Sequence, residues 1–196
     1  AVVDVLAKKL HAAIAEQSLG STHVPAAHGF TAQVVGALHP EGVFVVDRAR
    51  GNLVVVDAKT QSVVATVAVG PEPGTIALSP TGETAYVTLI SAAEVAVVDM
   101  ERHQVAARIS VEPNPYAIAI TDDGDADDYD EQIFITHLLA FPRPGAAEAS
   151  DNSRFGHVTI IDPKTNSVTN QITLQPDIHG FPNLLTGVAV TESHAW

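Results

Sequence analysis

The 196-residue chain contains no cysteine, few basic residues and no long apolar run. The missing cysteine excludes disulfide bonds, thiolate metal sites and covalent attachment of c-type haem within this segment. No apolar stretch approaches the ~18–20 residues that a membrane-spanning helix needs. Lysine and arginine total 10 against 23 acidic residues, which gives a formal net charge of −13. Nucleic acids and anionic membrane surfaces are therefore poor partners, whereas cations are favoured.

What the chain does contain is a repeat. The tripeptide Val-Val-Asp ends at Asp4, Asp57 and Asp99, and Ile-Ile-Asp ends at Asp162. Asp57 and Asp99 are 42 residues apart, and the other two intervals are longer because they contain insertions. An apolar residue follows each aspartate by six positions. Repeats of about this length that contain four short strands are typical of β-propeller blades.

The predicted fold is therefore all-β: a β-propeller of four-stranded antiparallel blades. In the clearest copy we expect strands at 74–79, 84–90, 94–99 and 104–111, because these segments are rich in Val, Ile, Ala and Thr and are separated by turn residues. A β-sandwich is the alternative, but it would not repeat Val-Val-Asp in register. Since the aspartates recur in every unit, we assign them to turn hydrogen bonding rather than to catalysis.

The repeat resembles that of the YVTN-repeat β-propeller family, which includes cytochrome-associated propellers. The resemblance is carried by residues 54–60, 63–70, 77–82 and 85–88, and it extends over about residues 31–191. The tetrapeptide itself is imperfect, because Leu89 stands where the motif has asparagine. The resemblance implies a propeller ring of about seven blades, and it says little about function. We expect a periplasmic or extracellular location.

Residues 1–196 are predicted to form one propeller segment. The expected pieces are a partial blade at 1–14, complete blades at 31–69, 74–111 and 116–174, and the inner strand of a further blade at 186–191. Together they make about four blades. We therefore expect part of a larger, seven-bladed ring, completed by a longer chain or by another chain, because an open ring leaves unpaired strand edges. A small four-bladed ring is the alternative.

Three long insertions fall on one face of the predicted propeller, at 15–30, 141–155 and 175–186. Long loops on one face of a repeat array often form the binding face. The tripeptide His-Gly-Phe begins at His28 and again at His179, and His137 ends a strand near the same face. Neutral imidazole is a good ligand for metals and haem iron, so we predict that these three histidines bind a ligand or cofactor. Plain turn chemistry is the alternative.

The opposite face carries an acidic loop in which seven of the ten residues 122–131 are Asp or Glu. Oxygen ligands at alternate positions suit Ca²⁺. We predict a Ca²⁺ site made by Asp123, Asp125, Asp127 and Asp130, in which Glu131 is the alternative to Asp130 as the completing ligand. An EF-hand is excluded because Asp128 stands where that loop requires glycine. A solvated acidic turn is the alternative.

Three functions follow from these features. The first is a non-catalytic extracytoplasmic binding or scaffold domain that presents its long loops to a protein or ligand partner, since the chain has no recognisable nucleophile motif. The second is a redox-associated propeller whose His-Gly-Phe loops contact a haem or copper cofactor or a cytochrome. The third is a lactonase-like hydrolase, as some related propellers are. We expect Arg143 and Arg154, which lie in a long loop, to pair with local carboxylates.

Overall fold

The computed structural model describes residues 42–57, 59–147, 150, 152–182, 184–191 and 194–195. Every regular element within these residues is a β-strand, so the predicted all-β class is confirmed. None of the described residues forms a helix long and apolar enough to cross a membrane. The partial blade predicted at 1–14 lies outside the described residues.

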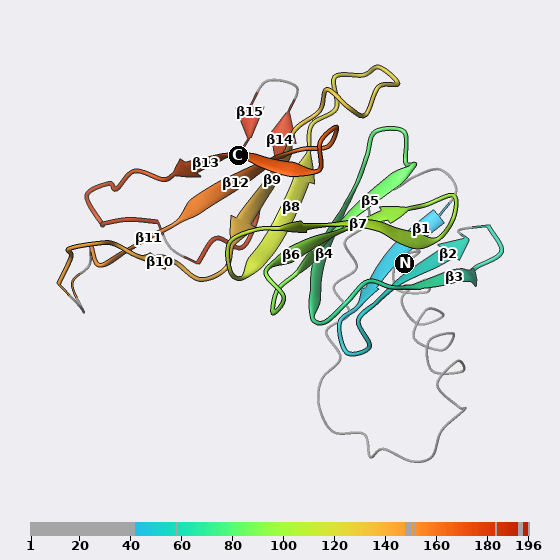
Figure 1. The fold of residues 1–196 in the computed structure, drawn as a ribbon, viewed down its shortest axis with the longest axis horizontal. Coiled ribbons are helices and arrows are strands. Elements are labelled where there is room, and N and C mark those ends of the chain that lie inside the picture. The colour runs from blue at the N-terminus through green and yellow to red at the C-terminus, as the bar shows by residue number, and fades with distance from the viewer. Residues whose placement is uncertain are drawn as a thin grey trace, which may run out of the picture.

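Three antiparallel sheets follow one another along the chain (Figure 1). The first contains β1 (Gly42–Asp47), β2 (Asn52–Asp57) and β3 (Ser62–Ala68). The second contains β4 (Pro73–Leu78), β5 (Thr84–Leu89), β6 (Glu94–Asp99) and β7 (Gln104–Ser110). The third contains β8 (Pro115–Ile120), β9 (Ile133–His137), β12 (His157–Asp162) and β13 (Ser167–Thr173). Two small hairpins pair β10 (Phe141–Pro142) with β11 (Arg154–Phe155), and β14 (Val190–Thr191) with β15 (His194–Ala195).

The second and third sheets are four-stranded antiparallel units of the predicted type. They occupy nearly the same residues as the blades expected at 74–111 and 116–174. The first sheet has three described strands, because the inner strand expected for the blade at 31–69 precedes Gly42 and lies outside the described residues. In the segment 186–191 only Val190–Thr191 is a strand, paired with β15. The seven-bladed ring stays a prediction.

The second sheet is buried on both faces. On β5, Val87 and Leu89 belong to the apolar cluster shared with the first sheet, whereas Tyr86 belongs to the cluster shared with the third sheet. Side chains alternate between the faces of a strand, so this burial needs a sheet on either side. The inner strand β4 accordingly contacts both β1 and β8. Successive sheets stacked face to face in this way are arranged as propeller blades are, and not as the two layers of a sandwich.

The repeated aspartates close the turns between the third and fourth strands. The Oδ1 atom of Asp57 accepts hydrogen bonds from the backbone N–H groups of Lys59 at 2.8 Å and Thr60 at 2.6 Å. Asp99 and Asp162 accept equivalent bonds in their own turns. Hydrogen bonds within these turns lower the pKa of all three carboxyl groups, and for Asp162 the hydroxyl of Thr165 has the largest effect. The predicted turn role of the aspartates is confirmed.

A threonine hydroxyl joins the second sheet to the third. Thr88 on β5 has no exposed surface, and its Oγ1 donates to the carbonyl oxygen of Tyr116 on β8 at 3.0 Å. The same Oγ1 accepts the N–H of Thr75 at 2.9 Å. At the corresponding position of β9, Thr136 donates to the carbonyl oxygen of Leu185 at 3.3 Å. The chain that leaves the third sheet therefore lies beside it as the inner strand of a following blade would.

We expect Thr88→Val to destabilise the protein by about 1–3 kcal/mol, because the buried N–H of Thr75 loses its acceptor. Thr66→Val is the matched control, since Thr66 lies exposed on β3. Urea unfolding measures both changes as shifts in midpoint at constant slope. Equal midpoints for the two variants would mean that this hydroxyl does not hold the sheets together.

Candidate functional site

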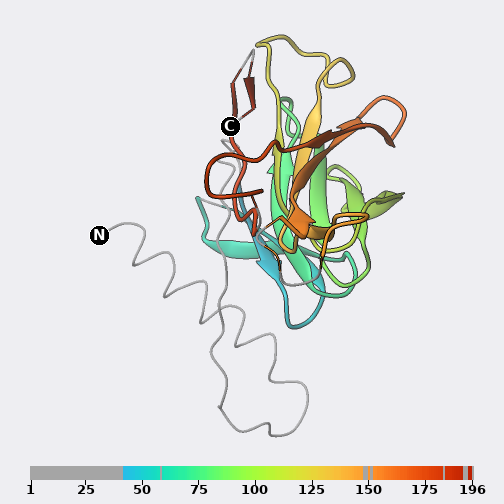
Figure 2. The same cartoon turned by 90° about the vertical axis from the view of Figure 1, so that its left-hand side faces the viewer.

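Because the strands are antiparallel, the connections of each unit are divided between two ends of the sheets. The connections after the second and fourth strands, residues 138–156 and 174–186, leave one end, which we call the long-loop end. The β10–β11 hairpin extends from this end at the lower left of Figure 1. The acidic loop between β8 and β9 rises from the opposite end, at the top of Figure 2. The insertion expected at 15–30 lies outside the described residues.

His137 is fully buried at the long-loop end of β9, with 1% of its surface exposed. Its Nδ1 lies 2.9 Å from the carbonyl oxygen of Pro113, and its Nε2 lies 2.9 Å from Oγ1 of Thr159. A carbonyl can only accept, so Nδ1 carries the proton and Nε2 accepts from the threonine hydroxyl. Both ring nitrogens are therefore occupied, and a cofactor would have to replace one of these hydrogen bonds.

The His137–Thr159 pair is a departure from the repeat. His137 ends β9 as Leu89 ends β5, and Thr159 precedes its turn aspartate by three residues as Ala96 does. Leu89 and Ala96 are fully buried in the apolar core of the second sheet. A polar pair at positions that another unit fills with apolar side chains is not required for blade formation. Such a departure is a better candidate for a special role than any residue that recurs.

His157 is a second buried histidine in the same place, and the sequence analysis missed it. Its ring centroid lies 4.9 Å from that of His137, and its side chain stacks on Phe141 of the hairpin at 4.1 Å with planes 11° apart. Its Nε2 is buried and has no hydrogen-bond partner among the described residues. The stack holds the hairpin against the third sheet. A histidine at the start of a strand was visible in the sequence. Its contact with Phe141 could not be predicted, because an inserted segment separates the two residues along the chain.

Burial lowers the pKa of both histidines below the usual value, and the negative charge of Glu112 opposes this shift only in part. For His137, the backbone hydrogen bond to Pro113 also opposes the shift, whereas the neighbouring His157 adds to it. Both imidazoles are therefore neutral at pH 7.

The second His-Gly-Phe motif forms a tight turn. The backbone N–H of Asp177 donates to the carbonyl oxygen of Gly180 at 3.0 Å, and the Asp177 carboxylate accepts the N–H of His179 at 2.7 Å. Gly180 has a φ of 109°, which favours glycine. The imidazole of His179 is exposed, unlike that of His137. These contacts favour the turn role for this copy, while His28 lies outside the described residues.

Exposed apolar side chains gather on the connections of the long-loop end. Leu139 is 50% exposed, Ile178 is 93% exposed and Leu184 is 58% exposed. The guanidinium of Arg143, from the hairpin, lies over the ring of Phe181 at 5.1 Å from its centroid. This contact joins the two connections to each other.

The expected pairing of the two loop arginines with local carboxylates stays a prediction, because Glu148 and Asp151 of the same loop lie outside the described residues. Among the described residues, Arg154 donates to the carbonyl oxygen of Ala140 at 3.1 Å, and the side chain of Arg143 contacts Phe181.

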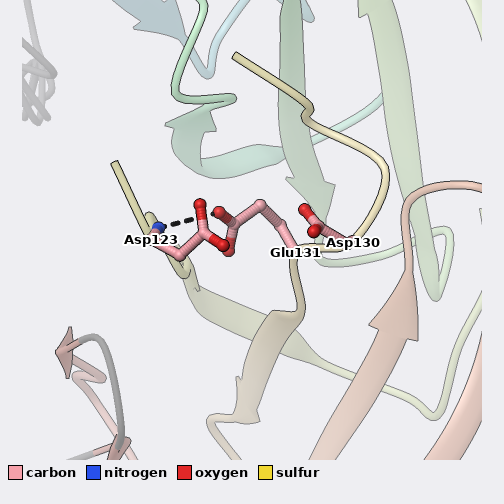
Figure 3. A group of neighbouring side chains, drawn as sticks. All are labelled: Asp123, Asp130 and Glu131. Atoms are coloured by element: carbon pink, nitrogen blue, oxygen red, sulfur yellow. Dashed lines mark hydrogen bonds between the residues drawn. The ribbon is translucent and has the colours of Figure 1, made fainter. Parts of the chain in front are cut away.

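At the opposite end, Asp123, Asp130 and Glu131 form a cluster of three carboxylates (Figure 3). One oxygen from each lies within 4.8 Å of the others. Glu131 is buried and fixed by hydrogen bonds from the hydroxyl of Thr121 and from the N–H of Asp123. Loss of hydration and the negative charges of neighbouring aspartates raise the pKa of Asp130. A divalent cation would relieve this repulsion.

The other aspartates of the acidic loop have different positions. Asp125 and Asp127 are exposed, and each accepts the N–H of the residue two positions later, as is usual for Asx turns. They lie outside the three-carboxylate cluster. Asp128 accepts hydrogen bonds from the N–H and hydroxyl of Thr81 in the second sheet. The loop is thereby anchored to the neighbouring unit.

An open cavity of about 910 Å³ lies at the same end as the acidic loop. Its lining includes residues of the turns at 81–84, 99–103 and 163–166, together with Asp57, Lys59 and Tyr129, and strand residues such as Phe44, Val55 and Tyr86. Acidic and basic side chains are mixed in this lining. Neither His137, nor His179, nor the predicted metal ligands line it. The cavity is therefore separate from both candidate sites.

We expect acid to destabilise the protein through the buried histidines. The pKa values of both histidines are lowered in the folded state. As the pH decreases below about 6.5, the usual pKa of histidine, the unfolded chain therefore binds more protons than the folded one. The free energy of unfolding then decreases as the pH decreases. The slope reaches at most about 1.4 kcal/mol per pH unit for each histidine. The double variant His137→Leu with Thr159→Ala introduces the residues that the second sheet has at these positions. It should reduce the change in the free energy of unfolding between pH 7 and pH 5, measured by urea unfolding.

His179→Gln is the control for that experiment, because it removes an exposed imidazole. It should keep the wild-type slope. A double variant as acid-sensitive as the wild type would show that His137 does not cause the loss.

Comparison with known proteins gives matches among solved structures alone. No protein-family description and no curated protein matches the chain. Among solved structures, the chain is similar to hydrazine synthase from Kuenenia stuttgartiensis, with a TM-score of 0.47 and 21% sequence identity. The similarity covers 79% of this chain and 53% of that one, so this chain spans about half the length of that protein.

The fold assignment thus depends on the sheets themselves. The described residues form propeller-type, four-stranded antiparallel units in an all-β chain, and membership of the YVTN-repeat family stays a prediction from the sequence.

Proposed function

We propose that this chain is a non-catalytic extracytoplasmic binding or scaffold domain that presents its long-loop end to a partner. The supporting observation is the exposure of Leu139, Ile178 and Leu184, all on connections of that end. An apolar side chain that is 93% exposed, as Ile178 is, contributes little to folding. Exposed apolar groups that gather on one surface are typical of interaction sites.

The two ends of the sheets differ in a way that supports a binding role for the long-loop end. The third-to-fourth turns are short and are closed by their own aspartates, so their sequences serve the blade. The connections of the long-loop end are longer, and the β10–β11 hairpin is held by the Phe141–His157 stack. A hairpin fixed in this way offers its outer residues to a partner with little loss of entropy on binding.

We further propose that the acidic loop binds Ca²⁺ through Asp123, Asp130 and Glu131, with Asp125 and Asp127 as the other predicted ligands. The spacing of the three carboxylates and the raised pKa of Asp130 support this, since clustered negative charges favour a bound cation. The loop is anchored to the second sheet by Asp128, so the cation would stabilise the contact between two units.

The redox-associated alternative stays a prediction that an absorbance spectrum and a metal analysis of the purified protein test directly. The lactonase-like hydrolase stays a prediction from the family resemblance, and hydrolysis of a panel of lactones with and without EDTA tests it.

The binding role predicts position-dependent photo-crosslinking. With a benzoylphenylalanine in place of Ile178, the chain should give discrete adducts in an extract of its source cells. Excess unlabelled chain should compete for these adducts, and Leu184→Ser should weaken them. The same probe in place of Val64, which is 55% exposed on β3, is the control and should give none. Equal labelling from both positions would remove the long-loop end as the binding surface.

The Ca²⁺ proposal predicts a rise in Tm. At a free Ca²⁺ concentration 100 times Kd, stabilisation of about 2.7 kcal/mol corresponds to a shift of about 5–10 °C for a chain of this size. Asp130→Asn should abolish most of the shift, because it removes one of the three clustered carboxylates. Asp122→Asn, in the same loop but outside the cluster, should retain it. The loop would be a solvated turn if Ca²⁺ left the wild-type Tm unchanged.

A further inference from the structure

The arginines of this acidic protein are not all placed alike. Most of the described ones form ion pairs with carboxylates: Arg48 with Glu72, Arg50 with Asp47, Arg102 with Asp99, and Arg108 with Glu94. Arg143 and Arg154 form no such pair within the described residues, and both belong to the β10–β11 hairpin. In a chain of net charge −13, the long-loop end therefore carries two guanidinium groups that have no carboxylate partner in the part of the chain that the structure describes.

Arg143 is held in a position from which it can bind an anion. Its guanidinium lies over the ring of Phe181, and this cation–π contact restricts the rotamers of the arginine before any ligand binds. A guanidinium that uses its flat face on an aromatic ring keeps its N–H edge for other acceptors. That edge matches a carboxylate, which it binds through two parallel hydrogen bonds.

Exposed apolar residues belong to the same connections as this charge. Ile178 belongs to the tight turn that precedes Phe181, Leu184 follows it, and Leu139 stands at the base of the hairpin. The surface therefore combines a restrained cation with exposed aliphatic side chains. A small carboxylate ligand would contact only the cation, and an uncharged apolar peptide would contact only the aliphatic side chains.

We propose that the long-loop end recognises an acidic, apolar protein segment, whose carboxylate pairs with Arg143 while its apolar side chains cover Ile178 and Leu184. This inference rests on the proposed binding function and names the chemistry of the partner. The strong negative charge of the remaining chain repels such a segment elsewhere, so the guanidinium also fixes where it binds.

Selection of peptides from a random 12-residue display library on the purified chain tests the proposal. The enriched peptides are expected to carry Asp or Glu next to apolar residues. Arg143→Gln should weaken the binding of a selected peptide about fivefold to tenfold, and Ile178→Ser about tenfold. The effect of Arg143→Gln should shrink at high salt, because exposed charges are screened.

Arg48→Gln is the matched control, since Arg48 is also an exposed arginine but already has Glu72 as its partner. It should bind the selected peptide as the wild type does. Enrichment of basic or uncharged peptides, no enrichment at all, or equal binding to the Arg143→Gln chain would each overturn the inference. If crosslinks from position 178 persist in that case, the binding function stands and only the acidic character of the partner is wrong.

Discussion

Contact between successive sheets is the constraint from which the rest of the structure follows. The hydroxyl of Thr88 bridges two inner strands, and the apolar faces on either side of the second sheet close against their neighbours. Because β4, β5 and β6 are buried on both faces, their sequences are almost continuously apolar and leave little room for polar groups that are not paired. The outer strands, such as β3 and β13, and the connections at the strand ends are free of this requirement.

This constraint distinguishes residues that recur in each sheet and stabilise it from residues that occur in one sheet alone. The aspartates at 57, 99 and 162 recur with the same hydrogen bonds, and they need no further explanation. His137 and Thr159 occupy positions that are apolar in the second sheet, and their mutual hydrogen bond satisfies groups that would otherwise be costly to bury. His157 lies beside His137 and stacks on Phe141, which holds the β10–β11 hairpin against the third sheet. These buried polar side chains therefore support the hairpin at the long-loop end.

Much of the fold followed from the sequence because its signals are local and periodic. The spacing of Val-Val-Asp identified the units, and the alternation of apolar residues placed strands within one or two residues of their observed bounds. The site was less accessible. His137 was found because it ends a strand, but its partner Thr159 comes from another strand, and the stack of Phe141 on His157 depends on how an inserted hairpin folds back. The carboxylate cluster contains two predicted ligands, Asp123 and Asp130, whereas Asp125 and Asp127 satisfy backbone groups of their own loop.

The insertion point of the hairpin has a consequence for how such a protein diversifies. The β10–β11 hairpin leaves and re-enters the third unit between β9 and β12, where the second unit has only the short connection 90–93 between β5 and β6. Pairing between these two strands is antiparallel in both units, with or without the extra residues. Connections between the second and third strands can therefore be lengthened or exchanged between units, and the hydrogen-bonded pairing of the two strands stays antiparallel.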